Sequence, residues 1–281
     1  MATVLAISSS VARGAVGLAA IVPVLQGLGH EVIALPTVLL SNHPGHARHA
    51  RHDVPAAALL EMLAALDEPG WLSGVDAVLT GYLPGSEHVH VAAEAVHRVK
   101  RRRPDARFLC DPVIGDDPGG LYIGAAAAAA VRSLLLPLAD LMTPNRFELA
   151  WLSERAVTTA AEAAAAARAL PPEATVVTSL GGDGPEIANV LIGCEGAWSC
   201  AVPRQENVPH GTGDLLSALL LGHWLAGRTL NEALGLATAG VKAVVDRSLG
   251  AGELHLVESA SCWSRVAPLP VLQIGREVKH T

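Results

Sequence analysis

A glycine-rich turn that carries an aspartate precedes the apolar stretch 215–220: it contains Gly211, Gly213 and Asp214. Because glycine has no Cβ, consecutive backbone N–H groups can turn toward one point, and a following helix would direct its positive end there. Such a turn suits a phosphoryl group that gains negative charge. The helix N-terminus would also keep Asp214 ionised, so its carboxylate could accept the proton of an attacking hydroxyl. The structural alternative is an ordinary turn with a capping aspartate.

Two further polar segments could bind a metal ion or a phosphate. Asn145 and Glu148 are three residues apart and would face the same way on a first helical turn, where their oxygen atoms suit Mg²⁺. The alternative is a capping box in which Glu148 reaches back to the helix start. Asp111 stands at the end of a predicted strand, where its carboxylate could face metal or phosphate; the alternative is a turn-forming Asp-Pro pair.

Two common nucleotide-binding motifs are absent from the sequence. Neither G-x-x-x-x-G-K-[ST] nor G-x-G-x-x-G occurs anywhere in the chain. The chain is therefore not expected to be a P-loop enzyme, and a dinucleotide-binding fold loses support.

Strand-like and helix-like stretches alternate along the whole chain. Strands are expected at 3–8, 31–35, 75–80, 107–110 and 175–178, a hairpin at 187–192 and 197–202, and helices at 15–28, 59–66, 89–103, 125–136, 160–170, 215–226 and 230–245. This alternation predicts an α/β fold, a three-layer α/β/α sandwich with a mostly parallel central sheet, in a single domain over 1–281. Such sheets bind ligands beyond the carboxyl ends of their strands, so the residues after each strand should carry the chemistry.

The composition favours a globular protein with a large aliphatic core. Of the 281 residues, 51% are hydrophobic and 17% are charged, which argues against disorder. The net charge of −7 argues against nucleic acid as a partner, and the basic run 100–103 is interpreted as a solvated helix end. The N-terminus has no charged leader region, and no uncharged apolar run reaches about 18 residues. We therefore expect no membrane partner and a cytoplasmic location.

Four histidines recur at every third position: His43, His46, His49 and His52. On a helix this spacing could bring neighbouring imidazoles to one zinc ion, although Pro44 and Gly45 disfavour a regular helix. We interpret 37–54 instead as a mobile, solvated lid over a substrate. One or more of these histidines is expected to contact the substrate or its phosphate.

Together, several segments resemble the pyridoxal kinase family of the ribokinase-like superfamily, over roughly residues 3–248. The landmarks are 7–14 (Ile-Ser-Ser-Ser-Val-Ala-Arg-Gly), 37–43 (Thr-Val-Leu-Leu-Ser-Asn-His), 79–82 (Leu-Thr-Gly-Tyr), 110–113 (Cys-Asp-Pro-Val), 143–148 (Thr-Pro-Asn-Arg-Phe-Glu) and 211–214 (Gly-Thr-Gly-Asp). The Ser-Asn-His and Thr-Gly-Tyr segments discriminate this family, whereas the last two landmarks occur across the superfamily.

The resemblance implies a kinase that uses ATP and Mg²⁺ to phosphorylate the 5′-hydroxymethyl group of pyridoxal or a related B6 vitamer. It also implies a homodimer; a requirement for a monovalent cation stays open. By resemblance, Asp214 is the catalytic base, and the anion hole for the transferred phosphoryl group consists of Gly211, Thr212 and Gly213. The implied ATP-binding residues are Asp111, Thr143, Asn145, Glu148, Thr178, Val202 and Arg204, of which Asp111 and Glu148 also bind the metal. The substrate-binding residues that the resemblance implies are Ser9 and Asp214, and His43 and His46 are added to them from the histidine series above.

The sequence departs from the family pattern at four positions of the substrate pocket and lid. Ser10 stands where the family usually has His, Leu18 where it has Asn, and His46 and His49 where it has Tyr and Trp. The phosphate-binding segments are intact, so they support kinase activity more strongly than they support pyridoxal as the substrate. A hydroxymethylpyrimidine kinase of the same fold is one alternative. A vitamin or nucleotide binder without turnover is another, which the altered lid favours and the retained Asp214 opposes.

Overall fold

The computed structural model describes residues 1–181 and 184–274. The other residues of the domain expected over 1–281 lie outside the described residues. Ten strands of the described chain form one sheet in the order β12-β11-β10-β9-β8-β5-β4-β1-β2-β3. These strands are β1 (Thr3–Val11), β2 (Glu31–Leu40), β3 (Arg51–Asp53), β4 (Ala77–Thr80), β5 (Arg107–Cys110), β8 (Leu141–Met142), β9 (Ala174–Leu180), β10 (Glu186–Gly193), β11 (Gly196–Pro203) and β12 (Leu272–Gln273).

The centre of the sheet is parallel and its two margins are antiparallel. The parallel strands are β2, β1, β4, β5, β8 and β9. The strands β10, β11 and β12 add antiparallel to one margin, and β3 adds antiparallel to the other. A separate two-stranded ribbon pairs β6 (Gly115–Asp116) with β7 (Gly120–Leu121). The predicted mostly parallel sheet and the predicted hairpin, β10 and β11, are both confirmed.

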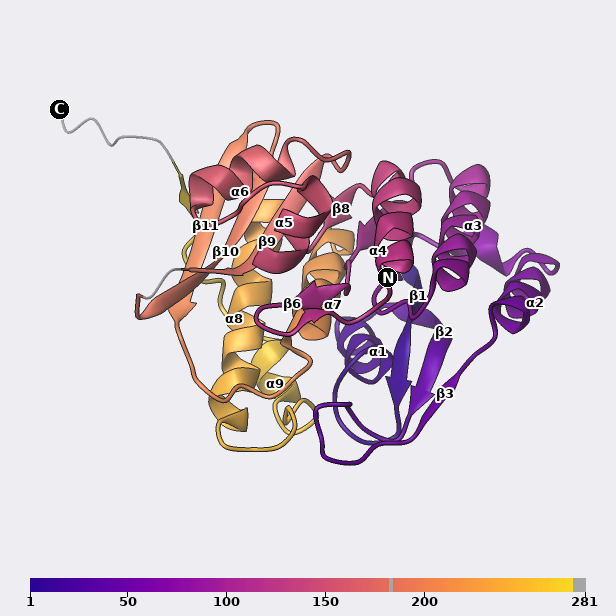
Figure 1. Ribbon diagram of the computed structural model, residues 1–281, viewed down its shortest axis with the longest axis horizontal. Coiled ribbons are helices and arrows are strands. Elements are labelled where there is room, and N and C mark those ends of the chain that lie inside the picture. The colour runs from indigo at the N-terminus through magenta and orange to yellow at the C-terminus, as the bar shows by residue number, and fades with distance from the viewer. Residues whose placement is uncertain (182–183, 275–281) are drawn as a thin grey trace.

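Helices cover both faces of the sheet, as Figure 1 shows. They are α1 (Leu18–Gly27), α2 (Ala56–Asp67), α3 (Ser86–Arg102), α4 (Ala125–Ala130), α5 (Arg146–Ser153), α6 (Ala160–Ala167), α7 (Thr212–Leu225), α8 (Leu230–Ser248) and α9 (Ala260–Trp263). The core on one face contains residues of α2 to α6, and the core on the other contains residues of α1, α7, α8 and α9. The predicted three-layer α/β/α sandwich is thus confirmed as a single domain.

The interior strand β1 explains the unbroken apolar run in its sequence. Its side chains alternate between the two faces, so Leu5 and Ile7 enter one core while Val4 and Ala6 enter the other. All four side chains are fully buried. A strand covered on both faces requires apolar residues at successive positions, which is the pattern of a parallel sheet between helical layers.

The order of strands places a topological switch point beside β1. The chain moves from β1 to β2 on one side of it, and β4 then pairs on the opposite side. Ligands bind at such a point, beyond the carboxyl ends of the strands. The residues at the ends of β1, β4 and β5 therefore become the focus of the site.

Several element boundaries differ from the sequence-based expectation. Helix α1 begins at Leu18 rather than at residue 15, because Gly14 and Gly17 adopt positive φ angles of 109° and 56°. The helix expected over 125–136 is confirmed as helical, but it changes type along its length: α4 ends at Ala130 and a wider π-helical turn continues over Val131–Leu135. A short 3₁₀ turn then holds Pro137, whose missing N–H cannot continue an α-helix.

The segment expected as a lid over 37–54 contains parts of two strands, and its role as a lid stays a prediction. Residues 37–40 belong to β2, and β3 returns antiparallel to it, pairing Leu40 with Arg51. Only 41–50 connects the two strands, and this connection contains no helix. The helical arrangement of histidines considered for zinc is therefore wrong.

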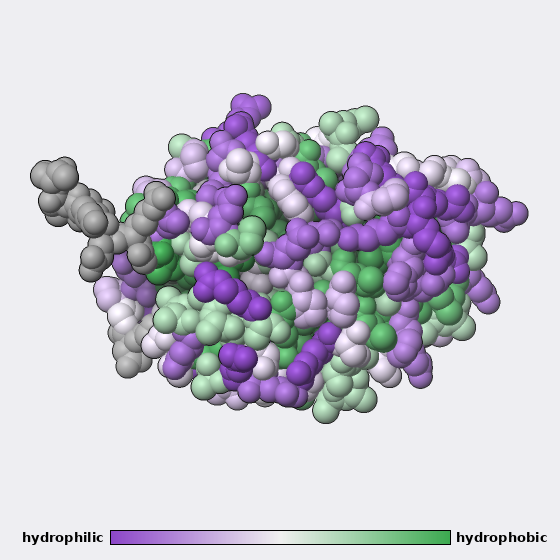
Figure 2. Space-filling view, turned by 90° about the horizontal axis from the view of Figure 1, so that it is seen from above, coloured by the Kyte–Doolittle hydropathy of each residue, from purple (hydrophilic) through white to green (hydrophobic). Residues whose placement is uncertain are grey.

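Polar and apolar residues are mixed on the surface. Figure 2 shows hydrophilic side chains over the face seen from above, with apolar residues between them. None of the helices within the described ranges has the length and apolarity that a membrane span requires.

Candidate active site

Asp214 lies in the first turn of α7, directly after the glycine turn. Gly211 has a φ of 107°, and a Cβ placed on it would lie 2.0 Å from the carbonyl oxygen of Ala15. The glycine is therefore required not only for its backbone freedom but also because the loop before α1 packs directly against the turn.

The carboxylate of Asp214 faces the loop before α1 and the ends of two central strands. The backbone N–H of Gly17 donates a hydrogen bond to it. A Cβ placed on Gly81, which follows β4, would lie 3.8 Å from Oδ1 of Asp214 and 2.4 Å from Oγ of Ser8 in β1. Burial raises the pKa of Asp214 to about 6, in spite of the helix N-terminus and the Gly17 N–H. The carboxylate is thus ionised at neutral pH and has the basicity that suits a general base there.

Ser9 approaches the same point from β1. A Cβ placed on Gly17 would lie 2.4 Å from the Ser9 hydroxyl oxygen and 2.3 Å from the Ser9 carbonyl oxygen. Gly17 therefore lies beside both Ser9 and Asp214. The structure brings the predicted substrate contact next to the predicted base.

Replacing Gly17 with Ala is expected to lower kcat/KM by about 100-fold, because the new methyl group would displace both Ser9 and the N–H that Asp214 accepts. The matched control is Gly29→Ala, since Gly29 also has a positive φ (85°) but a Cβ placed on it would have nothing within 4 Å. Gly29→Ala should lose about 1 kcal/mol of stability from backbone strain, and Gly17→Ala should lose more because its Cβ would also clash with the Ser9 carbonyl oxygen. Steady-state kinetics should separate the two variants. Equal activity in the two variants would contradict this role of Gly17.

Asp111 forms a buried hydrogen-bonded chain with two hydroxyl groups. Ser217 donates from Oγ to Oδ2 of Asp111 at 2.9 Å, and Oγ of Ser217 lies 2.9 Å from Oγ1 of Thr143. The Thr143 hydroxyl also hydrogen-bonds to Asp111. Burial, and then the charge of Asp214, raises the pKa of Asp111 to about 7. A cation beside Asp111 would relieve this unfavourable burial of charge.

Glu148 is buried, with both carboxylate oxygens bound to backbone N–H groups. Oε1 accepts from Ile114 at 3.0 Å, and Oε2 accepts from Asn145 at 2.9 Å. Asn145 in turn accepts from the Glu148 N–H at 2.9 Å, so the capping-box alternative is confirmed. Burial, and then the charge of Asp111, raises the pKa of Glu148 well above its usual value. Its role as a metal ligand stays a prediction.

The donor set fits a magnesium ion that is held together with nucleotide phosphates. Mg²⁺ commonly uses one or two protein carboxylates and completes its shell with phosphate oxygens and water. Asp111 lies close enough to Glu148 for its charge to raise the pKa of that carboxyl. Over residues 1–181 and 184–274, no three His, Cys, Asp or Glu side chains group closely enough to hold a metal ion by themselves.

A cavity of about 290 Å³ lies beside the glycine turn, between the β10–β11 hairpin and α8. Four residues predicted for the site line it: Thr178, Val202, Thr212 and Gly213. Arg204, also predicted there, donates instead from Nε to the carbonyl oxygen of Gly184 at 3.4 Å.

Several residues at this edge were missed by sequence reasoning. Ser217 could have been found, because it lies one turn after Asp214 on the same helical face. Asn189 and Thr238 line the cavity beside the glycine turn, and Nδ2 of Asn189 donates to Oγ1 of Thr238 at 3.0 Å. No local pattern marks these two residues, since they come from β10 and α8.

Of the four histidines in the series 43–52, His43 and His46 contact side chains from distant parts of the chain. The His43 ring stacks on His210 with centroids 3.9 Å apart, and Nε2 of His46 lies 2.8 Å from Oε1 of Glu253. His52 lies in β3, and His49 is exposed. The structure thus places His43 beside the residue that precedes Gly211, and His46 against the loop that follows α8.

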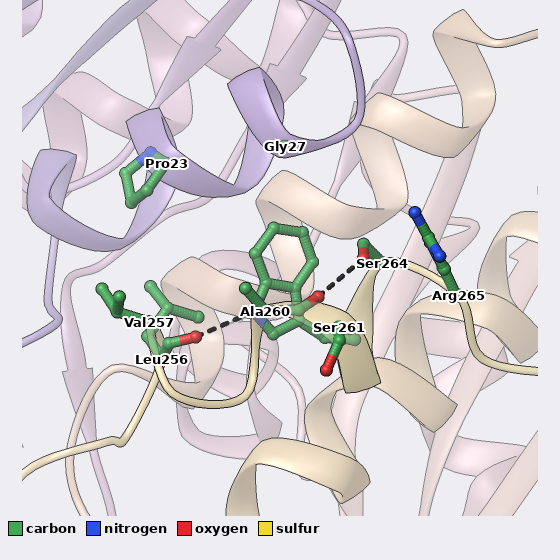
Figure 3. A pocket seen from close by; sticks show the side chains of 9 residues that line it. Pro23, Gly27, Leu256, Val257, Ala260, Ser261, Ser264 and Arg265 are labelled. Carbon is green, nitrogen blue, oxygen red and sulfur yellow. Dashed lines mark hydrogen bonds between the residues drawn. The ribbon is translucent and has the colours of Figure 1, made fainter.

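A second pocket lies on the outer face, between α1 and α9 (Figure 3). It is lined mainly by apolar groups, among them Pro23, Leu256 and Trp263, with Arg265 at its edge. None of the predicted site residues, all of which lie in the described part of the chain, is among those that line this second pocket.

Comparisons with known proteins agree with this geometry. The family model described as phosphomethylpyrimidine kinase matches residues 14–257. A pyridoxal kinase of Rubrobacter xylanophilus is 40% identical over 274 residues, covering 94% of each chain, and one of Corynebacterium diphtheriae is 34% identical, covering 91% of this chain and 93% of that one. The structure of pyridoxal kinase from Leishmania donovani in complex with ADP and pyridoxine superposes with a TM-score of 0.91 at 30% identity, over 97% of this chain and 99% of that one. The chain belongs to the pyridoxal kinase family of the ribokinase-like fold.

Proposed function

We propose that this protein transfers the terminal phosphoryl group of ATP to the 5′-hydroxymethyl group of pyridoxal or a related B6 vitamer. The observation that carries this proposal is the position of Asp214. Its carboxylate accepts a hydrogen bond from Gly17, in the loop before α1, and Gly17 in turn lies next to Ser9. On the other side, Thr212 and Gly213 of the same turn line the cavity that we assign to ATP.

In the proposed reaction, Asp214 accepts the proton of the hydroxymethyl group as its oxygen attacks the γ-phosphorus. The new O–P bond forms while the bond from the γ-phosphorus to the bridging oxygen breaks, and ADP leaves. Backbone N–H groups at Gly211, Thr212 and Gly213 stabilise the charge on the transferred group, and one such donor contributes on the order of 3 kcal/mol. Asp111 and Glu148 would hold Mg²⁺, which would neutralise charge on the phosphates when bound. We further propose that the protein acts as a cytoplasmic homodimer.

A hydroxymethylpyrimidine kinase is the second candidate, because the matching family model carries the description phosphomethylpyrimidine kinase. We favour a B6 vitamer since the relatives above are pyridoxal kinases over nearly their whole length.

Pyridoxal, pyridoxine or pyridoxamine is expected to be phosphorylated with a kcat/KM at least about tenfold above that of hydroxymethylpyrimidine. The measurement is ADP release and product identification with each alcohol in the presence of Mg²⁺ and ATP. A preference for the pyrimidine would support the second candidate. Absence of turnover with all four alcohols would support the third alternative, a binder without catalysis.

A further inference from the structure

We infer that Glu253 and His210 are positioning residues that hold the lid segment, residues 41–50, closed over the substrate end of the site. Glu253 does so through His46, and His210 does so through His43. The inference rests on the proposed function, because a closed lid matters only for a bound substrate. Neither residue stood out in the sequence.

Two contacts join the lid segment to parts of the chain about 170 to 210 residues away. Nε2 of His46 lies 2.8 Å from Oε1 of Glu253, in the loop after α8, and the Glu253 side chain is only 17% exposed. The rings of His43 and His210 stack at 3.9 Å with an interplanar angle of 22°. Both partners lie outside the lid segment, so these contacts must break when the lid segment lifts away.

Two glycines make room for these contacts. A Cβ placed on Gly14 would lie 2.6 Å from Oε2 of Glu253. A Cβ placed on Gly45 would lie 2.9 Å from Nδ1 of His43 and 3.0 Å from Nε2 of His210. A side chain at either glycine would therefore have to displace these groups from their present positions.

The stack of His43 on His210 contains a His43 ring that is uncharged. The N–H of Gly45 donates to Nδ1 of His43 at 3.0 Å, so this nitrogen is the acceptor. Burial, followed by the neighbouring His210, lowers the pKa of His43 to about 4. The His43 ring is thus uncharged at neutral pH, and its stacking does not place two cations together.

The loop before α1 connects the lid to the catalytic base. At its start, the N–H of Arg13 donates to the carbonyl oxygen of Ser41 at the base of the lid, at 3.0 Å. In its middle, Gly14 packs against Glu253, and at its end Gly17 donates to Asp214. His210 directly precedes Gly211 of the anion hole. A closed lid therefore lies against the two segments that surround the reacting groups.

The test uses the full-length variants Glu253→Ala, His46→Ala and the double variant. We expect each single change to raise the KM for pyridoxal about tenfold while the KM for ATP stays within about twofold, since fewer molecules have the closed lid. The double variant should be no worse than either single variant, because both remove the same contact. Glu253→Gln, which keeps a hydrogen-bonding oxygen, should restore most of the affinity.

Trypsin cleavage after Arg48 provides a readout that needs no turnover. Arg48 is exposed within the lid segment, and we expect cleavage there, followed by mass spectrometry, to accelerate about tenfold in the single variants. The matched control is Glu258→Ala, because Glu258 also faces a histidine, His255, at 3.4 Å but is 79% exposed. Multiplicative effects in the double variant, or unchanged cleavage after Arg48, would overturn the inference. If the wild type failed to phosphorylate pyridoxal, the proposed function would fail while the cleavage assay still tested the lid contacts.

Discussion

Replacing Asp214 with Asn should lower kcat by about three orders of magnitude or more while ATP and pyridoxal still bind. Asparagine has the same shape and can still accept the hydrogen bond from the Gly17 N–H, but it cannot take up the proton of the attacking hydroxyl. The measurement combines steady-state kinetics with calorimetric binding of each ligand. Asp105→Asn is the control, because Asp105 is 80% exposed on the surface. A rate close to that of the wild type would remove Asp214 from the mechanism.

The pH profile of the wild type follows from the same carboxylate. Burial raises the pKa of Asp214 to about 6, and the reaction needs the ionised form. The value of kcat/KM should therefore rise with pH through about 6 and level off above it. The residual activity of the Asn variant should lack this inflection.

Replacing Asp111 with Asn should lower activity about 100-fold and at the same time stabilise the fold. The loss of activity is expected because the variant removes a charge that we assign to Mg²⁺ binding, and a higher Mg²⁺ requirement should accompany it. The gain in stability is expected because the Asp111 carboxylate is buried and its pKa is raised to about 7. Asparagine could still accept the hydrogen bond from Ser217 without carrying a buried charge.

The stability effect should depend on pH in a defined direction. A carboxyl group whose folded-state pKa is raised favours the folded state at low pH, and this contribution is lost as the pH rises from the unfolded pKa to the folded pKa. The difference between Asp111→Asn and wild type should thus be small near pH 4 and largest above pH 7. A rise from 3.8 to about 7 sets an upper limit of about 4 kcal/mol, and we expect about 1–3 kcal/mol.

Urea unfolding in the presence of EDTA at the two pH values measures this difference. Asp140→Asn serves as the contrasting control, since Asp140 accepts from Lys100 at 3.0 Å and from the N–H of Phe108 at 2.6 Å. Removing that ion-paired charge should lower stability rather than raise it. If Asp111→Asn also lowered stability at high pH, the pKa of the Asp111 carboxyl group would not be raised in the folded protein.

The architecture was predictable from the sequence because its pattern is local. The apolar run at 3–8 and the helical stretches between strands are enough to indicate a parallel sheet between two helical layers. The boundaries were less predictable, since they depend on backbone geometry. Gly17 delays α1 to Leu18, and Pro36 does not end β2, which continues to Leu40.

The candidate site was predictable to the extent that its residues follow strands or begin helices. Asp111 and Thr143 follow β5 and β8, whose carboxyl ends share one edge of the sheet, and Asp214 lies in the first turn of α7. The alternatives for Glu148 were open in the sequence, since an Asn-x-x-Glu spacing serves both a capping box and a metal site. Only the structure shows its two oxygens bound to backbone N–H groups.

The sequence alone thus determined the sheet, its helical layers and the short motifs at the strand ends, because hydrophobic period and turn chemistry act over a few residues. The tertiary structure decided which distant side chains complete the site: Ser217 beside Asp111, Gly17 beside Asp214, and Glu253 against His46. It also raised the pKa of Asp214 rather than lowering it. Burial depends on how remote segments pack around a group, and no local pattern of residues encodes that environment.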